Sequence, residues 1–146
     1  MTQIIIVAAV AALALGVGWY MQRQAPDAPT GVPNHKTPAQ IDRADFTRPD
    51  APWLVAVFTS ATCSTCAKVW TSTQLVESDE VAIQNLEVVS DAALHERYAI
   101  TAVPAVVIAD ASGVVRASFL GPPTSADLWA KLAELRDESD GATRPS

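Results

Sequence analysis

The fold of this 146-residue chain is indicated by residues 53–68, which read WLVAVFTSATCSTCAK. The run from Trp53 to Phe58 is unbroken in its apolar character and has the length of a strand, which is typical of a strand buried on both faces of a sheet. Two cysteines, Cys63 and Cys66, follow after a short polar stretch. Apolar residues near helical spacing then predict a helix from about Ser64 to Glu77. The cysteine pair therefore lies where a buried strand leads into a helix.

This position has chemical consequences for the two thiols. The first turn of a helix carries unpaired N–H groups and the positive end of the helix dipole, and both stabilise a thiolate. Because the thiolate is the species that attacks a disulfide, a cysteine placed here gains nucleophilicity near neutral pH. Only Cys63 projects from the N-terminal edge of the helix, so it is predicted to be the more exposed thiol. Cys66 lies one turn later, close enough to form a disulfide, and the hydroxyls of Ser64 and Thr65 are placed to hydrogen-bond the Cys63 sulfur.

Other uses of a CxxC pair are zinc binding, a structural disulfide or two inert buried thiols. Zinc sites usually combine two such pairs, or one pair with two nearby histidines, whereas His35 and His95 lie in different segments. A disulfide that closes so short a loop would stabilise the fold little. The strand–CxxC–helix order favours a redox pair, so we predict no metal and no cofactor.

The chain after the cysteine pair alternates strand and helix patterns, which predicts an α/β fold with a mixed sheet covered by helices. Residues 137–146 are polar and are predicted to form a disordered tail. The expected elements are a strand at Val81–Val89, a helix at Asp91–Tyr98, a β-hairpin formed by residues 105–109 and 114–119, and a final helix that begins at Ser125 and carries Leu128, Trp129, Leu132 and Leu135 on one face.

A second motif, Ala102-Val103-Pro104, directly precedes the first strand of the hairpin. A proline that opens a central strand is unusual unless its geometry is special, and a cis X–Pro bond is one such case. The chain resembles the thioredoxin superfamily over about Asp45 to Arg136. The matching pieces are the cysteine motif of residues 58–68, the segment from Tyr98 to Val106, which contains this proline, and Gly121 after the hairpin.

The resemblance implies a thioredoxin-like three-layer domain over residues 45–136, with a cis peptide bond at Pro104 beside the dithiol. It also implies thiol–disulfide exchange with an extended protein substrate that pairs with the backbone of Val103. The site residues that it implies are Cys63 as the attacking thiol, Cys66 as the resolving thiol, and Val103, Pro104 and Thr62 as substrate-binding residues.

The sequence departs from thioredoxins at the site itself. Thioredoxins have Trp before the first cysteine and Gly-Pro between the cysteines, where this chain has Thr62 and Ser64-Thr65. The buried acid of thioredoxins falls at Val57 and its partner lysine falls near Asn85, so the proton of Cys66 must go to water or to another group. The chain looks more similar to membrane-anchored bacterial thioredoxin-like proteins with a dedicated partner.

The other large or ionisable side chains of this region are predicted to have structural roles or to be solvated, with no part in the chemistry. Trp53, Trp70 and Trp129 are predicted to lie in the core or to line a groove, since large aromatic residues usually serve packing. His95 is predicted to face solvent from its helix. Lys68, one turn into the helix after the cysteines, is predicted to be solvated.

Residues 1–22 are predicted to form a single transmembrane anchor. The segment Ile4 to Met21 is almost wholly apolar, and as a helix it would be about 27 Å long, close to the ~30 Å thickness of the hydrocarbon core. A cleaved signal peptide is less favoured because no basic residue precedes the run, and Ala25 and Ala28 are each followed by proline. A buried core helix of this length without a polar residue is rare.

Residues 23–44 are predicted to form a Pro-rich tether that ends in a short helix. Six of the ten prolines fall between Pro26 and Pro52, and such a stretch builds neither a regular helix nor a central strand. The Thr-Pro pair that opens residues 37–44 predicts the short helix. Arg23 and Lys36 follow the apolar segment, which favours a cytoplasmic domain on a single-pass anchor in the cell membrane, although two cations leave the side open.

The net charge of −6 and the lack of a basic cluster that could bind phosphates argue against a nucleic-acid partner. The predicted function is that of a membrane-tethered, monomeric thiol–disulfide oxidoreductase that exchanges disulfides with a protein partner. The alternative is a redox-sensing or interaction module of the same fold that does not turn over substrate. Thiol-based metal delivery is a third hypothesis. The redox direction depends on the relative stability of the reduced and oxidised forms, which the sequence does not give.

Overall fold

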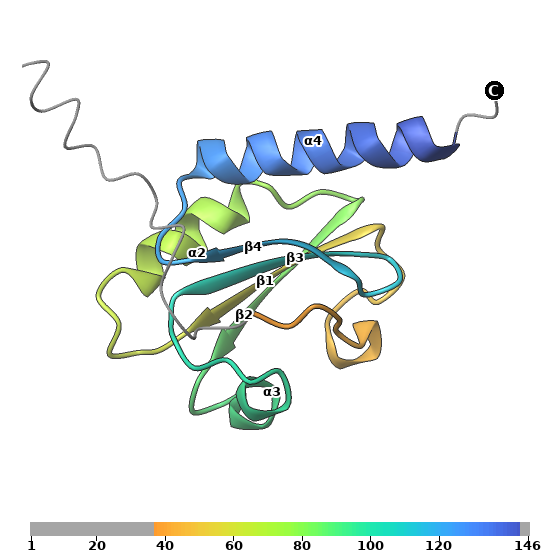
Figure 1. Cartoon of the computed structure of the whole chain (residues 1–146). Helices are drawn as coiled ribbons and strands as arrows, with labels where there is room; N and C mark the ends of the chain where they lie inside the picture. Colours follow the sequence, from red (N-terminus) through yellow and green to blue (C-terminus); the bar gives the residue numbers. More distant parts are fainter. Residues whose placement is uncertain (1–36, 144–146) are drawn as a thin grey trace, which may run out of the picture. The chain divides into compact units, whose positions relative to one another are not determined.

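The computed structural model describes residues 37–143 of the chain (Figure 1). Within this part, no helix is both long enough and apolar enough to cross a membrane. The anchor predicted at residues 1–22 and most of the tether predicted at residues 23–44 lie outside the described residues.

A mixed four-stranded sheet forms the centre of the domain. Strand β1 (Trp53–Thr59) lies between β2 (Val81–Glu87), which runs parallel to it, and β3 (Ala105–Asp110), which runs antiparallel. Strand β4 (Val115–Leu120) pairs antiparallel with β3, so the strand order is β2-β1-β3-β4. The mixed sheet expected from the order of the sequence patterns is confirmed.

Helical segments cover both faces of this sheet, as Figure 1 shows. Helices α2 (Cys66–Gln74) and α4 (Ser125–Thr143) pack on one face. Helix α3 (Ala92–Arg97) and the short 3-10 helix η1 (Arg43–Asp45) lie on the other. The sheet and its two covers form the three-layer α/β arrangement that the resemblance implies.

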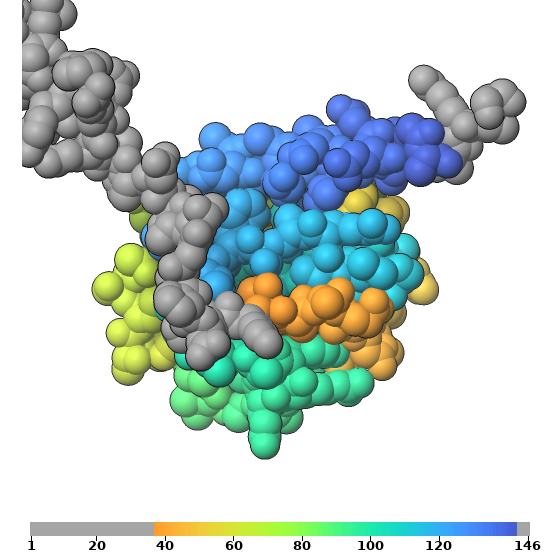
Figure 2. Space-filling model, viewed as in Figure 1, coloured from red at the N-terminus to blue at the C-terminus, as the bar shows by residue number. Residues whose placement is uncertain are grey.

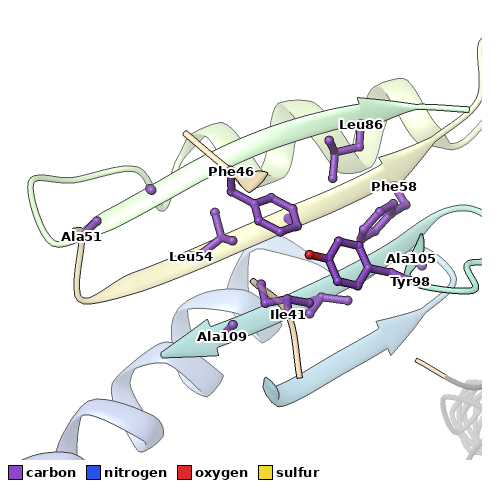
Figure 3. Packing of buried hydrophobic residues seen from close by; sticks show 12 residues of the cluster. Ile41, Phe46, Ala51, Leu54, Phe58, Leu86, Tyr98, Ala105 and Ala109 are labelled. Carbon is purple, nitrogen blue, oxygen red and sulfur yellow. The ribbon is translucent and has the colours of Figure 1, made fainter. Parts of the chain in front are cut away.

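Strand β1 is buried along its whole length because it meets a helical layer on each face. Alternate residues point to opposite faces and so contribute to two separate apolar clusters. The cluster beneath α3 and η1 is drawn in Figure 3 and contains Ile41, Phe46, Ala51, Leu54, Ala56, Phe58, Ala82, Leu86, Tyr98, Ala105, Val107 and Ala109. The cluster beneath α2 and α4 contains Trp53, Val55, Val57, Val69, Val76, Val81, Ile83, Val106, Ile108, Leu128, Leu132 and Leu135.

The short helix predicted for residues 37–44 is wrong. Gln40 instead forms a β-bridge with Val114, and the Ile41 N–H donates to the Gly113 carbonyl at 2.8 Å. The helical turn that does form, η1, starts later and is capped by Asp42, whose carboxylate accepts the Ala44 N–H at 3.0 Å. Pairing with a hairpin far along the chain thus outweighs the local Thr-Pro signal for a helix start.

Helix α4 is longer than predicted and continues to Thr143, so the disordered tail predicted for residues 137–146 is wrong over 137–143, and its last three residues lie outside the described part of the chain. Its first turns place Leu128, Leu132 and Leu135 in the core as expected. Trp129, which was predicted to share this apolar face, does not lie in the core, because it is 48% exposed. Residues 137–143 stay helical although Asp, Ser, Gly and Thr, which have low helix propensity, make up most of this stretch. Within it the Ser139 hydroxyl donates to the Arg136 carbonyl at 2.7 Å.

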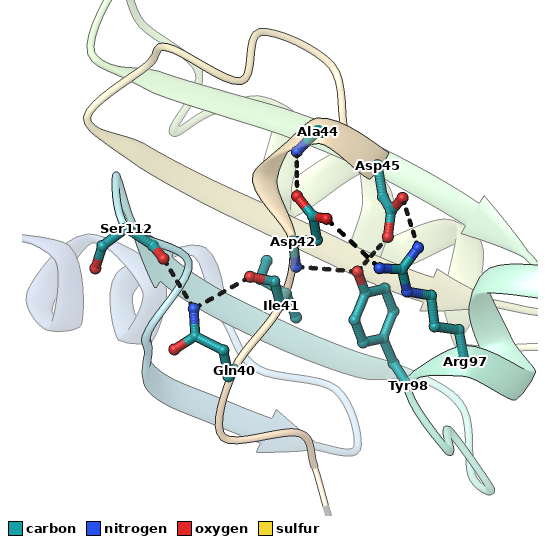
Figure 4. A network of polar contacts seen from close by, with 8 residues as sticks. All are labelled: Gln40, Ile41, Asp42, Ala44, Asp45, Arg97, Tyr98 and Ser112. Carbon is teal, nitrogen blue, oxygen red and sulfur yellow. Dashed lines mark hydrogen bonds and ion pairs between the residues drawn. The ribbon is translucent and has the colours of Figure 1, made fainter.

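A polar network fastens the segment before β1 to the rest of the domain (Figure 4). The Tyr98 hydroxyl donates to the Asp45 carboxylate and accepts the Asp42 N–H at 3.1 Å, while Arg97 forms an ion pair with Asp45 at 3.0 Å. Burial, together with the hydrogen bond to Asp45, raises the pKa of Tyr98 above its ordinary value. Figure 2 shows this segment, in orange, lying between the β3–β4 hairpin and α3.

Gly113 should be irreplaceable in the hairpin turn, whereas Gly121 should tolerate a side chain better. Both have positive φ angles, of +80° and +96°, but a Cβ at Gly113 would overlap the Ile41 carbonyl oxygen and one at Gly121 would meet nothing within 4 Å. We expect Gly113→Ala to lower the free energy of unfolding by about 2 kcal/mol more than Gly121→Ala does, measured by urea denaturation. Equal losses would show that residues 39–41 do not pair with the hairpin.

Candidate active site

The two cysteines lie at the C-terminal end of β1, where the chain turns into α2. They form a disulfide with a Cα–Cα distance of 5.4 Å. Cys66 is the first residue of α2 and is only 2% exposed, whereas Cys63 is half-buried at the surface. The prediction that Cys63 is the more exposed of the pair is confirmed.

The loop before α2 is shaped by hydrogen bonds of its own backbone. The Cys63 N–H donates to the Ser60 carbonyl at 3.1 Å, and the Cys66 N–H donates to the Cys63 carbonyl at 3.3 Å. The Thr65 hydroxyl lies 3.6 Å from the Cys63 sulfur, as its position in the motif predicted. Once the disulfide is reduced, this hydroxyl and the N-terminal end of α2 are both placed to stabilise a thiolate at Cys63.

The Val103-Pro104 motif lies at the same end of the sheet as the disulfide. Phe58, the next-to-last residue of β1, pairs with Ala105, the first residue of β3. Pro104, which precedes Ala105, therefore lies at the end of the sheet where β1 ends. The Val103–Pro104 peptide bond is cis, as the resemblance implies. Pro104 is buried, and its carbonyl accepts the Gly121 N–H at 2.9 Å.

The implied substrate-binding residues differ in exposure. Thr62 is exposed beside Cys63, and its hydroxyl lies 3.0 Å from that of Ser60. Val103 is half-buried. Thr62 and Val103 are therefore both accessible from solvent, whereas Pro104 is not.

The core beneath α2 is apolar, and none of the buried polar side chains in the described part of the chain (Arg43, Thr59, Thr73 and His95) is an acid. Val57 is fully buried there, at the position where the resemblance would place a carboxyl group. Its partner in β2 is Asn85, whose amide oxygen accepts a hydrogen bond from the buried Thr59 hydroxyl at 2.8 Å. The sequence-based expectation that the proton of Cys66 must go to water or another group is thus consistent with the packing.

Glu87, which sequence reasoning missed, connects the dithiol loop to its neighbour. Its carboxylate accepts the Ala61 N–H at 3.1 Å from the loop before Cys63, and the Val89 and Ser90 N–H groups at 2.8 and 3.1 Å from the loop after β2. These hydrogen bonds hold the pKa of Glu87 below its ordinary value. The only sequence signal for this role is an acid at the end of a strand, which is common at surfaces.

His95 is buried, contrary to the prediction that it faces solvent. Its side chain is 5% exposed, its Nε2 lies 2.9 Å from the Leu86 carbonyl oxygen, and its ring packs edge-on against Phe58 at 5.1 Å between centroids. The carbonyl acceptor indicates that Nε2 carries the proton. Lys68 is exposed, as predicted. Within residues 37–143, no three His, Cys, Asp or Glu side chains gather to form a metal site.

Comparison with known proteins identifies the fold. No family model matches the sequence, and no curated protein matches it. Among solved structures, a mutant thioredoxin from Halobacterium salinarum superposes with a TM-score of 0.55 at 20% identity, over 71% of this chain and 95% of that one. The germline-specific thioredoxin Deadhead from Drosophila melanogaster gives 0.54 at 19% identity, over 68% of this chain and 98% of that one.

A third match is the thioredoxin of Fasciola hepatica, with a TM-score of 0.52 at 19% identity, over 59% of this chain and 83% of that one. The chain therefore has the thioredoxin fold, with the cysteine pair and the cis-proline at the same end of the sheet.

Glu87 predicts a specific acid dependence of stability. Because its carboxylate is favoured by hydrogen bonds in the folded state, the stabilisation is complete above the ordinary Glu pKa of about 4.3 and is lost as the pH falls through the lower folded value. Neighbouring charges are Asp91, which accepts the Glu87 N–H, and His95. The free energy of unfolding should therefore decrease below about pH 4 more steeply in the wild type than in Glu87→Gln.

The measurement is urea denaturation at several pH values from about 6 down to about 3. Glu96→Gln is the matched control, because Glu96 is an exposed acid on the adjacent helix. Its pH profile should follow that of the wild type. Parallel profiles for the wild type and Glu87→Gln would contradict the assigned hydrogen bonds.

Proposed function

We propose that this protein is a thiol–disulfide oxidoreductase that exchanges disulfides with protein substrates through Cys63 and Cys66. The observation that carries the proposal is the disulfide itself, formed between a partly exposed and a buried cysteine at the start of a helix. The cis-Val103–Pro104 bond at the same end of the sheet supports it. The thioredoxin fold is compatible with this chemistry but does not by itself establish it.

The exchange proceeds in two balanced steps. In the reduced protein the Cys63 thiolate attacks a substrate disulfide, forming an intermolecular disulfide and releasing one substrate sulfur as a thiolate. Cys66 then loses its proton and attacks the Cys63 sulfur, which releases the second substrate sulfur and forms the intramolecular disulfide seen in the structure. Two electrons pass from the protein dithiol to the substrate disulfide, and the reverse sequence oxidises a substrate dithiol.

The Cys66 proton has few acceptors on the protein. Because the cluster beneath α2 is apolar at Val57, the departing substrate thiolate or a water molecule takes the proton in the second step. Resolution by Cys66 is therefore expected to be slower than attack by Cys63. This slow step suits a protein with one dedicated partner better than a general reductase.

A substrate segment would bind in an extended conformation across the end of the sheet. The Val103 backbone pairs with it, Pro104 supports it from below, and Thr62 contacts it beside Cys63. The substrate is a protein with an accessible disulfide or dithiol, and the oxidoreductase acts as a monomer.

Residues 1–22 would hold the domain at the cell membrane as a single-pass anchor, with residues 23–44 as the tether. The proposal rests on the length and apolar character of the segment Ile4 to Met21. Arg23 and Lys36, which follow this segment, favour the cytoplasmic side of the membrane for the domain.

A redox-sensing or interaction module without turnover is the second candidate. The apolar surroundings of Val57 favour it, because slow resolution by Cys66 would prolong the mixed disulfide between Cys63 and one partner and so limit turnover. The two candidates differ in whether one protein molecule processes many substrate disulfides.

Steady-state exchange separates the two candidates. With excess dithiothreitol and a disulfide-bonded peptide, the full-length oxidoreductase should process many peptide molecules per protein, faster than dithiothreitol alone. In a separate reaction of the reduced variants with the peptide, without dithiothreitol, Cys66→Ser should accumulate a mixed disulfide through Cys63 and Cys63→Ser should accumulate none, as read by non-reducing electrophoresis. A single stoichiometric exchange without further acceleration would support the sensor, and trapping through Cys66 would reverse the assigned roles.

The anchor is tested by removing residues 2–22 from the chain. The truncated protein should move from the membrane fraction to the soluble fraction and keep a dithiol that can be oxidised and reduced, because the described domain has its own complete core. Aggregation of the truncated protein would mean that the apolar segment packs against the domain and is not a membrane anchor.

A further inference from the structure

The loop between β2 and α3 exposes two neighbouring apolar side chains. Val88 is 38% exposed and Val89 is 80% exposed. Among the described residues, Val89 is the most exposed of the large apolar side chains, which also include Leu75, Leu120 and Trp129. Both valines directly follow Glu87, the last residue of β2.

This loop has a fixed backbone. The Val88 N–H donates to the Thr59 carbonyl at 2.9 Å, which extends the ladder between β1 and β2 by one step. The Val89 and Ser90 N–H groups both donate to the Glu87 carboxylate. A side chain presented on such a backbone binds a partner at a lower entropic cost than one on a mobile loop.

The same carboxylate links the loop to the dithiol. Its other oxygen accepts the Ala61 N–H, two residues before Cys63. One side chain therefore holds together the loop that carries the reactive sulfur and the loop that carries Val89. The two loops are therefore neighbours, and in the strand order Val89 follows the strand on one side of β1 while Pro104 precedes the strand on its other side.

We propose that Val89 is a substrate-docking residue that binds an apolar side chain next to the reacting cysteine of the substrate, and that Glu87 positions it. This inference rests on the proposed function. It commits the oxidoreductase to polypeptide substrates with an apolar residue near the exchanged cysteine. Glu87 acts through the backbone of both loops and does not itself touch the substrate.

The spacing of the sheet sets where that apolar residue lies. Neighbouring strands are about 4.8 Å apart, and an extended chain advances about 3.3 Å per residue. A segment that crosses from Pro104 over Cys63 thus reaches the end of β2 within about two residues of its own cysteine. The substrate therefore needs an apolar side chain at one of the two positions beside its cysteine.

The test uses two disulfide-linked peptides that differ only beside the cysteine, with Leu at the two positions on each side in one and Ser in the other. The full-length wild type should show a KM for the Leu peptide about three- to tenfold lower than for the Ser peptide, because part of an apolar side chain is buried. Val89→Ser should abolish this preference with little change in kcat. Glu87→Gln should reduce it, because an amide nitrogen cannot accept the N–H groups that the carboxylate oxygens accept.

Leu75→Ser is the matched control. Leu75 is also strongly exposed, at 62%, but it follows the last turn of α2, at the end remote from the cysteines. This variant should keep the wild-type preference. A small aromatic disulfide, which has no side chain to dock, should react at the same rate with the wild type and with Val89→Ser.

Two results would overturn the docking role while leaving the oxidoreductase intact: equal KM values for the two peptides in the wild type, or an unchanged preference in Val89→Ser. If the reduced wild type exchanges with neither peptide nor the small disulfide, the proposed function itself fails. The two failures are therefore distinguishable.

Discussion

Burial of β1 on both faces is the constraint on which the rest of the structure depends. Each of its residues is inaccessible or nearly so, and the strand contributes to both apolar clusters. Burying one large aliphatic or aromatic side chain is worth about 1.5–3 kcal/mol. The polar backbone of the strand must then be paired with neighbours on both edges, which β2 and β3 provide. Its C-terminal end consequently has a fixed position, and the dithiol loop starts there.

This constraint extends to the chemistry through three connections at the end of the sheet. The chain leaves β1 at Thr59 and enters α2 at Cys66, which places Cys63 at the N-terminal edge of the helix. Antiparallel pairing of β1 with β3 brings Pro104 to the same end. The carboxylate of Glu87 then joins the dithiol loop to the loop that follows β2. The ends of three adjacent strands thereby meet around the cysteine pair, where we propose that an extended substrate binds.

The features that the sequence predicted correctly depend on residues close together in the chain. The apolar run of β1, the turn of the β3–β4 hairpin and the CxxC pair at a helix start are all visible in short windows. The cis bond at Pro104 followed from a resemblance to a known superfamily. The features that were missed depend on distant partners. Gln40 pairs with Val114, and the burial of His95 depends on Leu86 and Phe58.

Glu87 was missed for a related reason: the Val89 and Ser90 N–H groups are local donors, but the Ala61 N–H reaches its carboxylate only when the two loops fold side by side. Trp129 shows the opposite error. It was assigned to the apolar face of α4 by residue type, but the neighbouring Leu128 occupies the buried position. Helical spacing predicts which face is apolar, and only packing decides which residues at its border are covered.

The central claim is that Cys63 and Cys66 act as one reversible redox pair within an intact fold. A redox titration of the full-length protein in glutathione buffers, with free thiols alkylated and counted by mass, tests it most directly. The account predicts one two-electron transition in which both thiols are oxidised together. The ratio of reduced to oxidised protein should change tenfold over about 30 mV. The far-UV circular dichroism should stay constant throughout. Thiols that titrate separately, or a domain that unfolds on reduction, would contradict the account.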